Sequence, residues 1–141
     1  MLCSKQVSFF QQKKAWTISS TFKRDSRHIL YRPHLDGRTL FISFMTLAEV
    51  DYRAEARGWG ATRRADMAVH LRQFAVIDSD RALCRAWAKV RWQVREDGFE
   101  IGIPDAWVAA TALLYDVPLV THNRQDYSRV KGLKLISESP F

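Results

Sequence analysis

The segment that most constrains the fold is residues 103–127, near the C-terminal end of the chain. It opens with Pro104 and Asp105, a pair typical of a first helical turn, where the missing proline N–H costs nothing and a negative charge favours the helix dipole. The following residues are apolar on almost every side, which predicts a helix packed on more than one face. Pro118 helps to end that helix, and residues 119–121 fit a short buried strand.

Polar side chains follow this strand directly. His122, Asn123 and Asp126 come next in the chain. In open α/β sheets, sites form beyond the carboxyl ends of the strands. We therefore expect Asp105, Asn123 and Asp126 to converge, whereas the lone His122 fits an ordinary loop position better than a metal ligand.

Helical and strand patterns alternate along the rest of the chain. Thr46 and Glu49 match a capping box that opens a helix ending near Gly58. Alternating elements of this kind predict βα units around a mainly parallel sheet. The expected strands are residues 40–44, 74–77 and 133–136. The other expected helices are residues 61–73 and 81–96. Two weaker patterns suggest a strand at residues 6–10 and a helix at residues 22–30.

Length and composition favour one domain over residues 1–141, in which residues 1–21 form an atypical segment without a clear period. The 22 basic and 15 acidic residues give a net charge of +7, which is typical of a protein with a polyanionic partner such as nucleic acid or an acidic protein segment, and an ordinary charged surface is an equally good explanation. Cys3 and Cys84 form no zinc pattern, so we expect a reduced, cytoplasmic protein. No apolar run approaches the ~20 residues of a membrane span.

The expected helix at residues 81–96 is strongly basic. Basic residues beside an aromatic ring can contact phosphates and stack on a base. The plainer alternative, which the sequence favours, is a solvated helix face whose tryptophan is anchored in the core. The residues concerned are Arg81, Arg85, Lys89, Arg91, Trp92 and Arg95.

Acidic side chains are expected at equivalent ends of several elements. Glu49 follows one strand, Asp105 begins a helix, and Asn123 and Asp126 follow another strand. Carboxylates gathered there can hold Mg²⁺, which prefers oxygen ligands and is usually bound through few carboxylates plus substrate phosphates. Each residue also has a structural explanation: Glu49 closes a capping box, Asp105 complements a helix dipole, and Asp126 makes a turn.

At these residues the sequence resembles the PIN domain family, and within it the VapC-type toxins of bacterial toxin–antitoxin pairs. The resemblance covers residues 22–137. It is carried by Phe-Ile-Ser-Phe-Met-Thr-Leu-Ala-Glu at 41–49 and Pro-Asp-Ala-Trp-Val-Ala-Ala-Thr-Ala-Leu at 104–113, with residues 119–123 and 125–127 behind them. It implies a three-layer α/β/α fold with a mainly parallel central sheet, Mg²⁺- or Mn²⁺-dependent cleavage of RNA, a homodimer and a partner antitoxin.

The resemblance also assigns roles to individual positions. Glu49 and Asp105 match two metal-binding carboxylates, Asn123 falls where a fourth acid or an asparagine is usual, and Asp126 matches the acid that often follows it. Thr121 matches a polar residue that often lines the site. Glu49, Asp105 and Asp126 are therefore the expected catalytic residues, and Asn123 joins them as an expected metal ligand.

The sequence departs from the family at its beginning. PIN domains usually open with a strand carrying an Asp, whereas this chain has no Asp or Glu before Asp25. Residues 2–8 are the expected counterpart of that strand, which places Cys3, a poor Mg²⁺ ligand, at the position of the acid.

The sequence therefore supports a toxin ribonuclease first. The absent first Asp motivates an alternative, a catalytically impaired PIN domain that binds an antitoxin or RNA. A basic α/β protein that binds nucleic acid without metal is a third hypothesis, but it leaves the placement of Glu49 and Asp105 unexplained.

Overall fold

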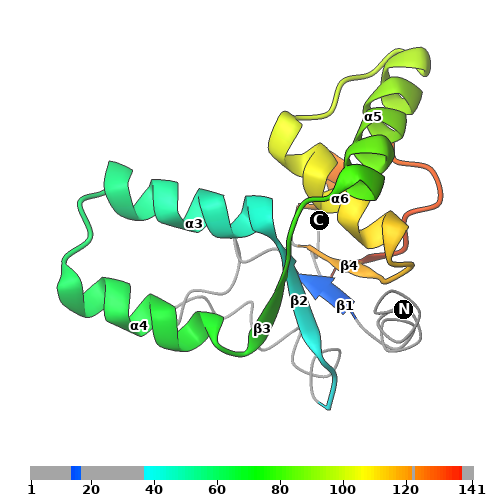
Figure 1. Cartoon of the computed structure of the whole chain (residues 1–141). Coiled ribbons are helices and arrows are strands. Elements are labelled where there is room, and N and C mark those ends of the chain that lie inside the picture. The colour runs from blue at the N-terminus through cyan, green and yellow to red at the C-terminus, as the bar shows by residue number, and fades with distance from the viewer. Residues whose placement is uncertain (1–13, 17–36, 122, 138–141) are drawn as a thin grey trace.

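The computed structural model describes residues 14–16, 37–121 and 123–137, and their strands form one five-stranded, all-parallel sheet (Figure 1). The strand order is β3-β2-β1-β4-β5, so β1 lies at the centre and β3 and β5 at the edges. Every neighbouring pair is parallel. The strands are β1 Lys14–Trp16, β2 Leu40–Ser43, β3 Phe74–Ile77, β4 Leu119–Val120 and β5 Leu135–Ile136.

Helices cover both faces of the sheet. The helices α3 and α4 lie on one side, and α5 and α6 on the other (Figure 1). They are α3 Phe44–Ala56, α4 Ala61–Leu71, α5 Arg81–Glu96, α6 Ile103–Leu114 and the short α7 Arg124–Tyr127.

The hydrophobic core is correspondingly split in two. One cluster joins α3 and α4 to the sheet and includes Val120 of β4, while the other joins α5, α6 and α7 to the opposite face and includes Leu119. Adjacent strand residues point to opposite faces, so this division follows from the strand period of two. The expected three-layer α/β/α fold is confirmed.

Most elements lie where the sequence predicts them. The bounds of β3 and α5 agree with the prediction, and β2, α4, α6, β4 and β5 differ by a few residues at most. The long helix α5 begins at a genuine N-cap, because Asp80 accepts a hydrogen bond from the backbone N–H of Leu83 at 2.8 Å. The helix expected at residues 22–30 and the strand expected at 6–10 lie outside the described residues.

The predicted capping box is wrong. Helix α3 begins at Phe44, and its N-cap is Ser43, whose hydroxyl accepts a hydrogen bond from the N–H of Met45 at 3.1 Å. Thr46 is already inside the first turn and buried. Ser43 ends β2 and so offers a capping hydroxyl before Thr46 is reached. Glu49 is therefore free of the capping role that its sequence context suggested.

The central strand is the second correction. Residues 14–16 pair with β2 on one side and β4 on the other. The sequence gives no periodic pattern here, because three residues are too few to show one. Lys14–Trp16 holds the central place in the sheet, whereas residues 2–8, which the alignment assigned to the first family strand with Cys3 at the position of the acid, lie outside the described residues.

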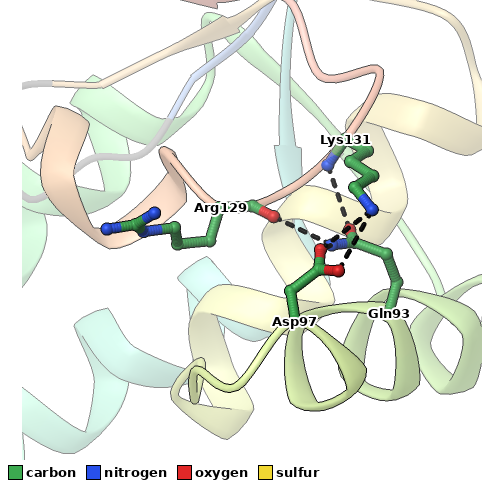
Figure 2. Close-up of polar contacts among 4 residues, drawn as sticks. All are labelled: Gln93, Asp97, Arg129 and Lys131. Carbon is green, nitrogen blue, oxygen red and sulfur yellow. Dashed lines mark hydrogen bonds and ion pairs between the residues drawn. The ribbon is translucent and has the colours of Figure 1, made fainter.

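The segment after α7 is fastened to the end of α5 by a polar network (Figure 2). The Gln93 amide N–H₂ donates to Asp97 at 2.7 Å and to the carbonyl oxygen of Arg129 at 3.0 Å, and its carbonyl oxygen accepts from the N–H of Lys131 at 3.0 Å. The Lys131 ammonium also pairs with Asp97 at 3.0 Å. These contacts tie the chain that follows α7 to the layer formed by α5 and α6.

None of the helices in the described part of the chain combines the length and apolar character that a membrane span requires.

Candidate functional site

The direction in which the chain builds the sheet reverses at β1. From this strand the sheet extends through β2 and β3 on one side and through β4 and β5 on the other. Ligands of open α/β sheets bind beyond the carboxyl ends of the strands at such a switch point. Helix α3 starts directly after β2, and α7 follows β4 after a short connection. The topology therefore directs Glu49 of α3 and Asp126 of α7 to this edge.

Asp105 is the best-positioned of the acidic residues. It lies in the first turn of α6 and is half-buried. The hydroxyl of Tyr127 donates a hydrogen bond to Asp105 Oδ1 at 3.2 Å, and Tyr127 itself is only 3% exposed. A Cβ placed on Gly102 would lie 3.3 Å from Asp105 Oδ2, so a residue without a side chain leaves room for this oxygen.

The electrostatic shifts show that the acidic residues act on one another. Burial raises the pKa of Asp105, and the charge of Asp126 raises it further, while the Tyr127 hydrogen bond acts in the opposite direction. Partial desolvation raises the pKa of Glu49, and the charge of Asp105 adds to this, with Arg53 opposing it.

The same acidic residues also affect the pKa of the buried Tyr127 hydroxyl. Burial raises the pKa of its hydroxyl most, followed by Asp105 and, more weakly, by the charges of Glu49 and Asp126. Carboxylates on three different helices therefore contribute to the electrostatic potential at this buried hydroxyl, and Asp105 is the one that contacts it. The charges of the predicted residues Glu49, Asp105 and Asp126 all act on this hydroxyl, and the structure adds Tyr127 as the hydrogen-bond partner of Asp105.

Asn123 and Thr121 lie at the same edge in different roles. Thr121 is buried, and its hydroxyl accepts a hydrogen bond from the N–H of Asn123 at 3.1 Å. Asn123 is exposed and forms the N-cap of α7 without a side-chain hydrogen bond to that helix. His122, between them, lies outside the described residues.

Tyr127 is the site residue that sequence reasoning misses. It follows Asp126 directly, but its partner Asp105 is 22 positions earlier, and no periodic pattern links two such positions. The only available signal is its neighbourhood, a tyrosine next to an acid after a buried strand.

The carboxylates do not form a closed metal cage. Within residues 14–16, 37–121 and 123–137, no three Asp, Glu, His or Cys side chains are grouped closely enough to enclose an ion. The arrangement is an open cluster of negative charge. Hard divalent cations that keep most of their waters suit such a cluster better than zinc, whose structural sites are closed.

These observations define a class: an α/β protein with an all-parallel sheet and an acidic cluster at its switch point. The chain belongs to the PIN domain family, because the family's profile, described as PIN domain, matches residues 17–133.

VapC proteins are among the relatives that this chain resembles. The chain is 25% identical over 119 residues to the tRNA(fMet)-specific endonuclease VapC of Salmonella typhimurium. This alignment covers 84% of this chain and 90% of the relative. It is 29% identical over 98 residues to ribonuclease VapC4 of Mycobacterium tuberculosis, covering 68% of this chain and 75% of that protein. The curated sequences that this PIN domain resembles are therefore named as nucleases.

Solved structures agree on the fold. VapBC2 from Rickettsia felis, determined bound to a DNA fragment from the promoter of its genes, matches with a TM-score of 0.77 over 88% of this chain and 97% of that chain, at 20% identity. At this identity the likeness supports the architecture alone.

Proposed function

We propose that the protein is a metal-dependent endoribonuclease that hydrolyses RNA phosphodiester bonds and serves as the toxin of a toxin–antitoxin pair. The observation that carries the proposal is the electrostatic coupling of Glu49, Asp105 and Asp126 around Tyr127 at the switch point of the sheet. The names of the VapC relatives support RNA as the substrate.

The oxygen donors of these residues are of the kind that Mg²⁺ and Mn²⁺ prefer, which supports either ion as the proposed cofactor. Glu49, Asp105 and Asp126 would hold it through carboxylate oxygens, with the Asn123 amide beside them. Raised pKa values at Glu49 and Asp105 mean that negative charge is unfavourable there without a cation, which is the condition that a bound ion relieves. When bound, such an ion supplies an activated water and positive charge for the developing oxyanion.

The chain itself supplies orientation and binding. Tyr127 fixes Asp105 by holding Oδ1, so that the carboxylate plane is set from within the protein. Arg and Lys side chains would hold the RNA backbone, because phosphate contacts position a nucleic acid without reading its sequence. We propose a homodimer in the cytoplasm that a partner antitoxin neutralises, and the VapBC complexes among the structural neighbours support this partner.

A second candidate function is a catalytically impaired PIN domain that binds an antitoxin or RNA. One observation favours it: β1 ends at Trp16, and the sequence offers no Asp or Glu before Asp25. A site with one carboxylate fewer binds an ion more weakly, because less negative charge surrounds it.

The test is cleavage of end-labelled structured RNAs by purified protein with Mg²⁺, with Mn²⁺ or with EDTA. Asp105→Asn removes a charged ligand with little change of shape and should abolish cleavage. Asp51→Asn is a matched control, since Asp51 is an exposed carboxylate on the same helix as Glu49.

The outcomes separate the hypotheses. Cleavage that needs the ion and Asp105 but not Asp51 supports the nuclease. RNA binding without cleavage by folded protein supports the impaired module. Cleavage that is equal in the wild type and in Asp105→Asn would refute the assigned site, and RNA binding in EDTA without any cutting would favour a metal-free binding protein.

A further inference from the structure

Helix α5 exposes a large aromatic side chain where the sequence favoured a buried one. Trp92 is 61% exposed, so the interpretation that anchors it in the core is wrong. The core side of α5 is formed by Leu83, Val90 and Val94. The ring of Trp92 therefore lies largely outside the core that these three residues form.

The surroundings of Trp92 are basic. An α-helix turns by about 100° per residue, which places five outward residues within an arc of about 120°, with Trp92 in its middle. All five are exposed, and the arc extends over about 21 Å of helix length. We call this set the α5 outer face, and it consists of Arg81, Arg85, Lys89, Trp92 and Arg95.

The charges of the α5 outer face are available to a ligand. None of its four basic side chains forms an ion pair with another described residue. Glu96 is the one carboxylate of α5 inside the same arc, which leaves a net charge of three. Arg91 belongs elsewhere, because its guanidinium lies over the Trp87 ring at 5.4 Å.

We propose that the α5 outer face binds single-stranded RNA outside the acidic cluster, with Trp92 stacked on a base and the four basic side chains on neighbouring phosphates. This inference rests on the proposed function, because the RNA bound at the α5 outer face is the RNA that the acidic cluster would cut. A ring placed among cations is the arrangement by which proteins hold single strands without reading their sequence.

Other occupants fit this face less well. A symmetric contact between two copies of the chain through the α5 outer face would bring a net charge of three against the same charge, which is repulsive. An acidic protein segment would satisfy the four cations but gives the central Trp92 ring no preferred partner. RNA satisfies both, because every nucleotide carries a phosphate and a stacking base.

Binding is measured in EDTA on the full chain carrying Asp105→Asn, so that neither metal nor cleavage enters the result. The probe is a short fluorescein-labelled single-stranded RNA, and its anisotropy gives Kd over a range of KCl concentrations. Trp92→Ala should weaken binding by roughly 5- to 150-fold, the range known for loss of one stacked base. Arg85→Gln with Lys89→Gln should reduce the slope of log K against log salt by about 1.4, at about 0.7 for each lost phosphate contact.

Matched controls come from the opposite side of the sheet. Tyr52, 74% exposed on α3, provides Tyr52→Ala as the control for the aromatic ring. Arg57 and Arg72 are exposed near the ends of α3 and α4 and provide a double Arg→Gln control for the charges. Tyr52→Ala should leave Kd almost unchanged. The double Arg→Gln control should leave the salt slope near the wild-type value.

The proposal is overturned if Trp92→Ala and Tyr52→Ala bind the RNA with the same Kd. It is equally overturned if the Arg85→Gln/Lys89→Gln variant has the same salt slope as the Arg57→Gln/Arg72→Gln control. It is also overturned if Trp92→Ala changes the oligomeric state in sedimentation instead of the RNA affinity, or if polyglutamate competes as well as RNA of equal charge. Loss of binding in Trp92→Ala together with absent cleavage in the wild type would refute the nuclease but leave the RNA surface in place.

Discussion

The hydrogen bond from Tyr127 to Asp105 can be removed without removing the ring. Tyr127→Phe deletes only the hydroxyl, and the phenyl ring still fills a position that is 3% exposed. Asp105 Oδ1 then loses the donor that lies 3.2 Å away. We expect the variant to fold and to be less stable than the wild type at neutral pH.

The size of the effect follows from the geometry. Hydrogen bonds to charged groups contribute about 1.5–3 kcal/mol. A separation of 3.2 Å is long for an O–H···O bond, so the lower end, about 1.5 kcal/mol, applies. Unfolding entropy near 2.1 cal/mol/K per residue gives about 0.3 kcal/mol/K for 141 residues. The variant should therefore melt about 5 °C below the wild type.

The pH dependence identifies the cause. The folded pKa of Asp105 is raised, so Asp105 favours the folded state at low pH and this stability is lost as the pH rises through the folded pKa. Tyr127 limits that loss, because its hydrogen bond favours the charged carboxylate. In Tyr127→Phe the pKa of Asp105 should rise further, and the stability gap to the wild type should widen from acidic to neutral pH.

The assay is urea unfolding of both proteins in EDTA between pH 4 and pH 8. Tyr52→Phe, at an exposed tyrosine, is the control and should change stability by less than about 0.5 kcal/mol. A stability difference for Tyr127→Phe that stays constant over the whole pH range would show that the hydroxyl acts through packing alone and would refute the coupling to Asp105.

Three further changes test how the described structure is held together. Asp80→Ala should lower the free energy of unfolding by about 0.5–2 kcal/mol through loss of the α5 N-cap, measured by urea unfolding, whereas Ser79→Ala should have little effect. Gly102→Ala should displace the Asp105 carboxylate and reduce any metal-dependent cleavage by up to about 100-fold, and unchanged rates would show that the space beside Oδ2 is not needed. Gln93→Ala removes the centre of the network in Figure 2 and should speed amide hydrogen exchange in the segment after α7, with unchanged exchange counting against the anchoring role.

The fold was predictable where one element buries enough residues to show a period. Helix α5 has its core residues at helical spacing behind a capping Asp80, and its bounds were predicted correctly. The central strand β1 was not predictable, because three residues carry no period and their hydrogen bonds come from β2 and β4, far away in the chain. Position in the sheet is a tertiary property that the local pattern does not contain.

The acidic residues were predictable for a topological reason. Asp105 stands in the first turn of α6, Glu49 in the second turn of α3 and Asp126 in the short α7, and a parallel sheet gathers the helices that follow its strands at one edge. Their mutual distances and the donor to Asp105 were not predictable, because Tyr127 reaches Asp105 only when α7 packs against α6. The exposure of Trp92 was missed for a similar reason, since Val90 and Val94 fill the core side of α5 and leave the ring outside.

The number of carboxylates at this edge of the sheet determines what the absence of the first family Asp should change. Each carboxylate added to this edge strengthens the attraction for a cation but raises the pKa values of its neighbours and destabilises the empty site. If the protein binds the proposed ion, the lack of an Asp or Glu before Asp25 should make this edge less repulsive in the absence of metal and should weaken ion binding. Under the proposed function, more Mg²⁺ or Mn²⁺ should be needed for half-maximal cleavage than in PIN domains that carry the additional acid. Half-maximal cleavage by this chain at the same ion concentration as a VapC relative that retains the acid would show that the three carboxylates around Tyr127 are sufficient.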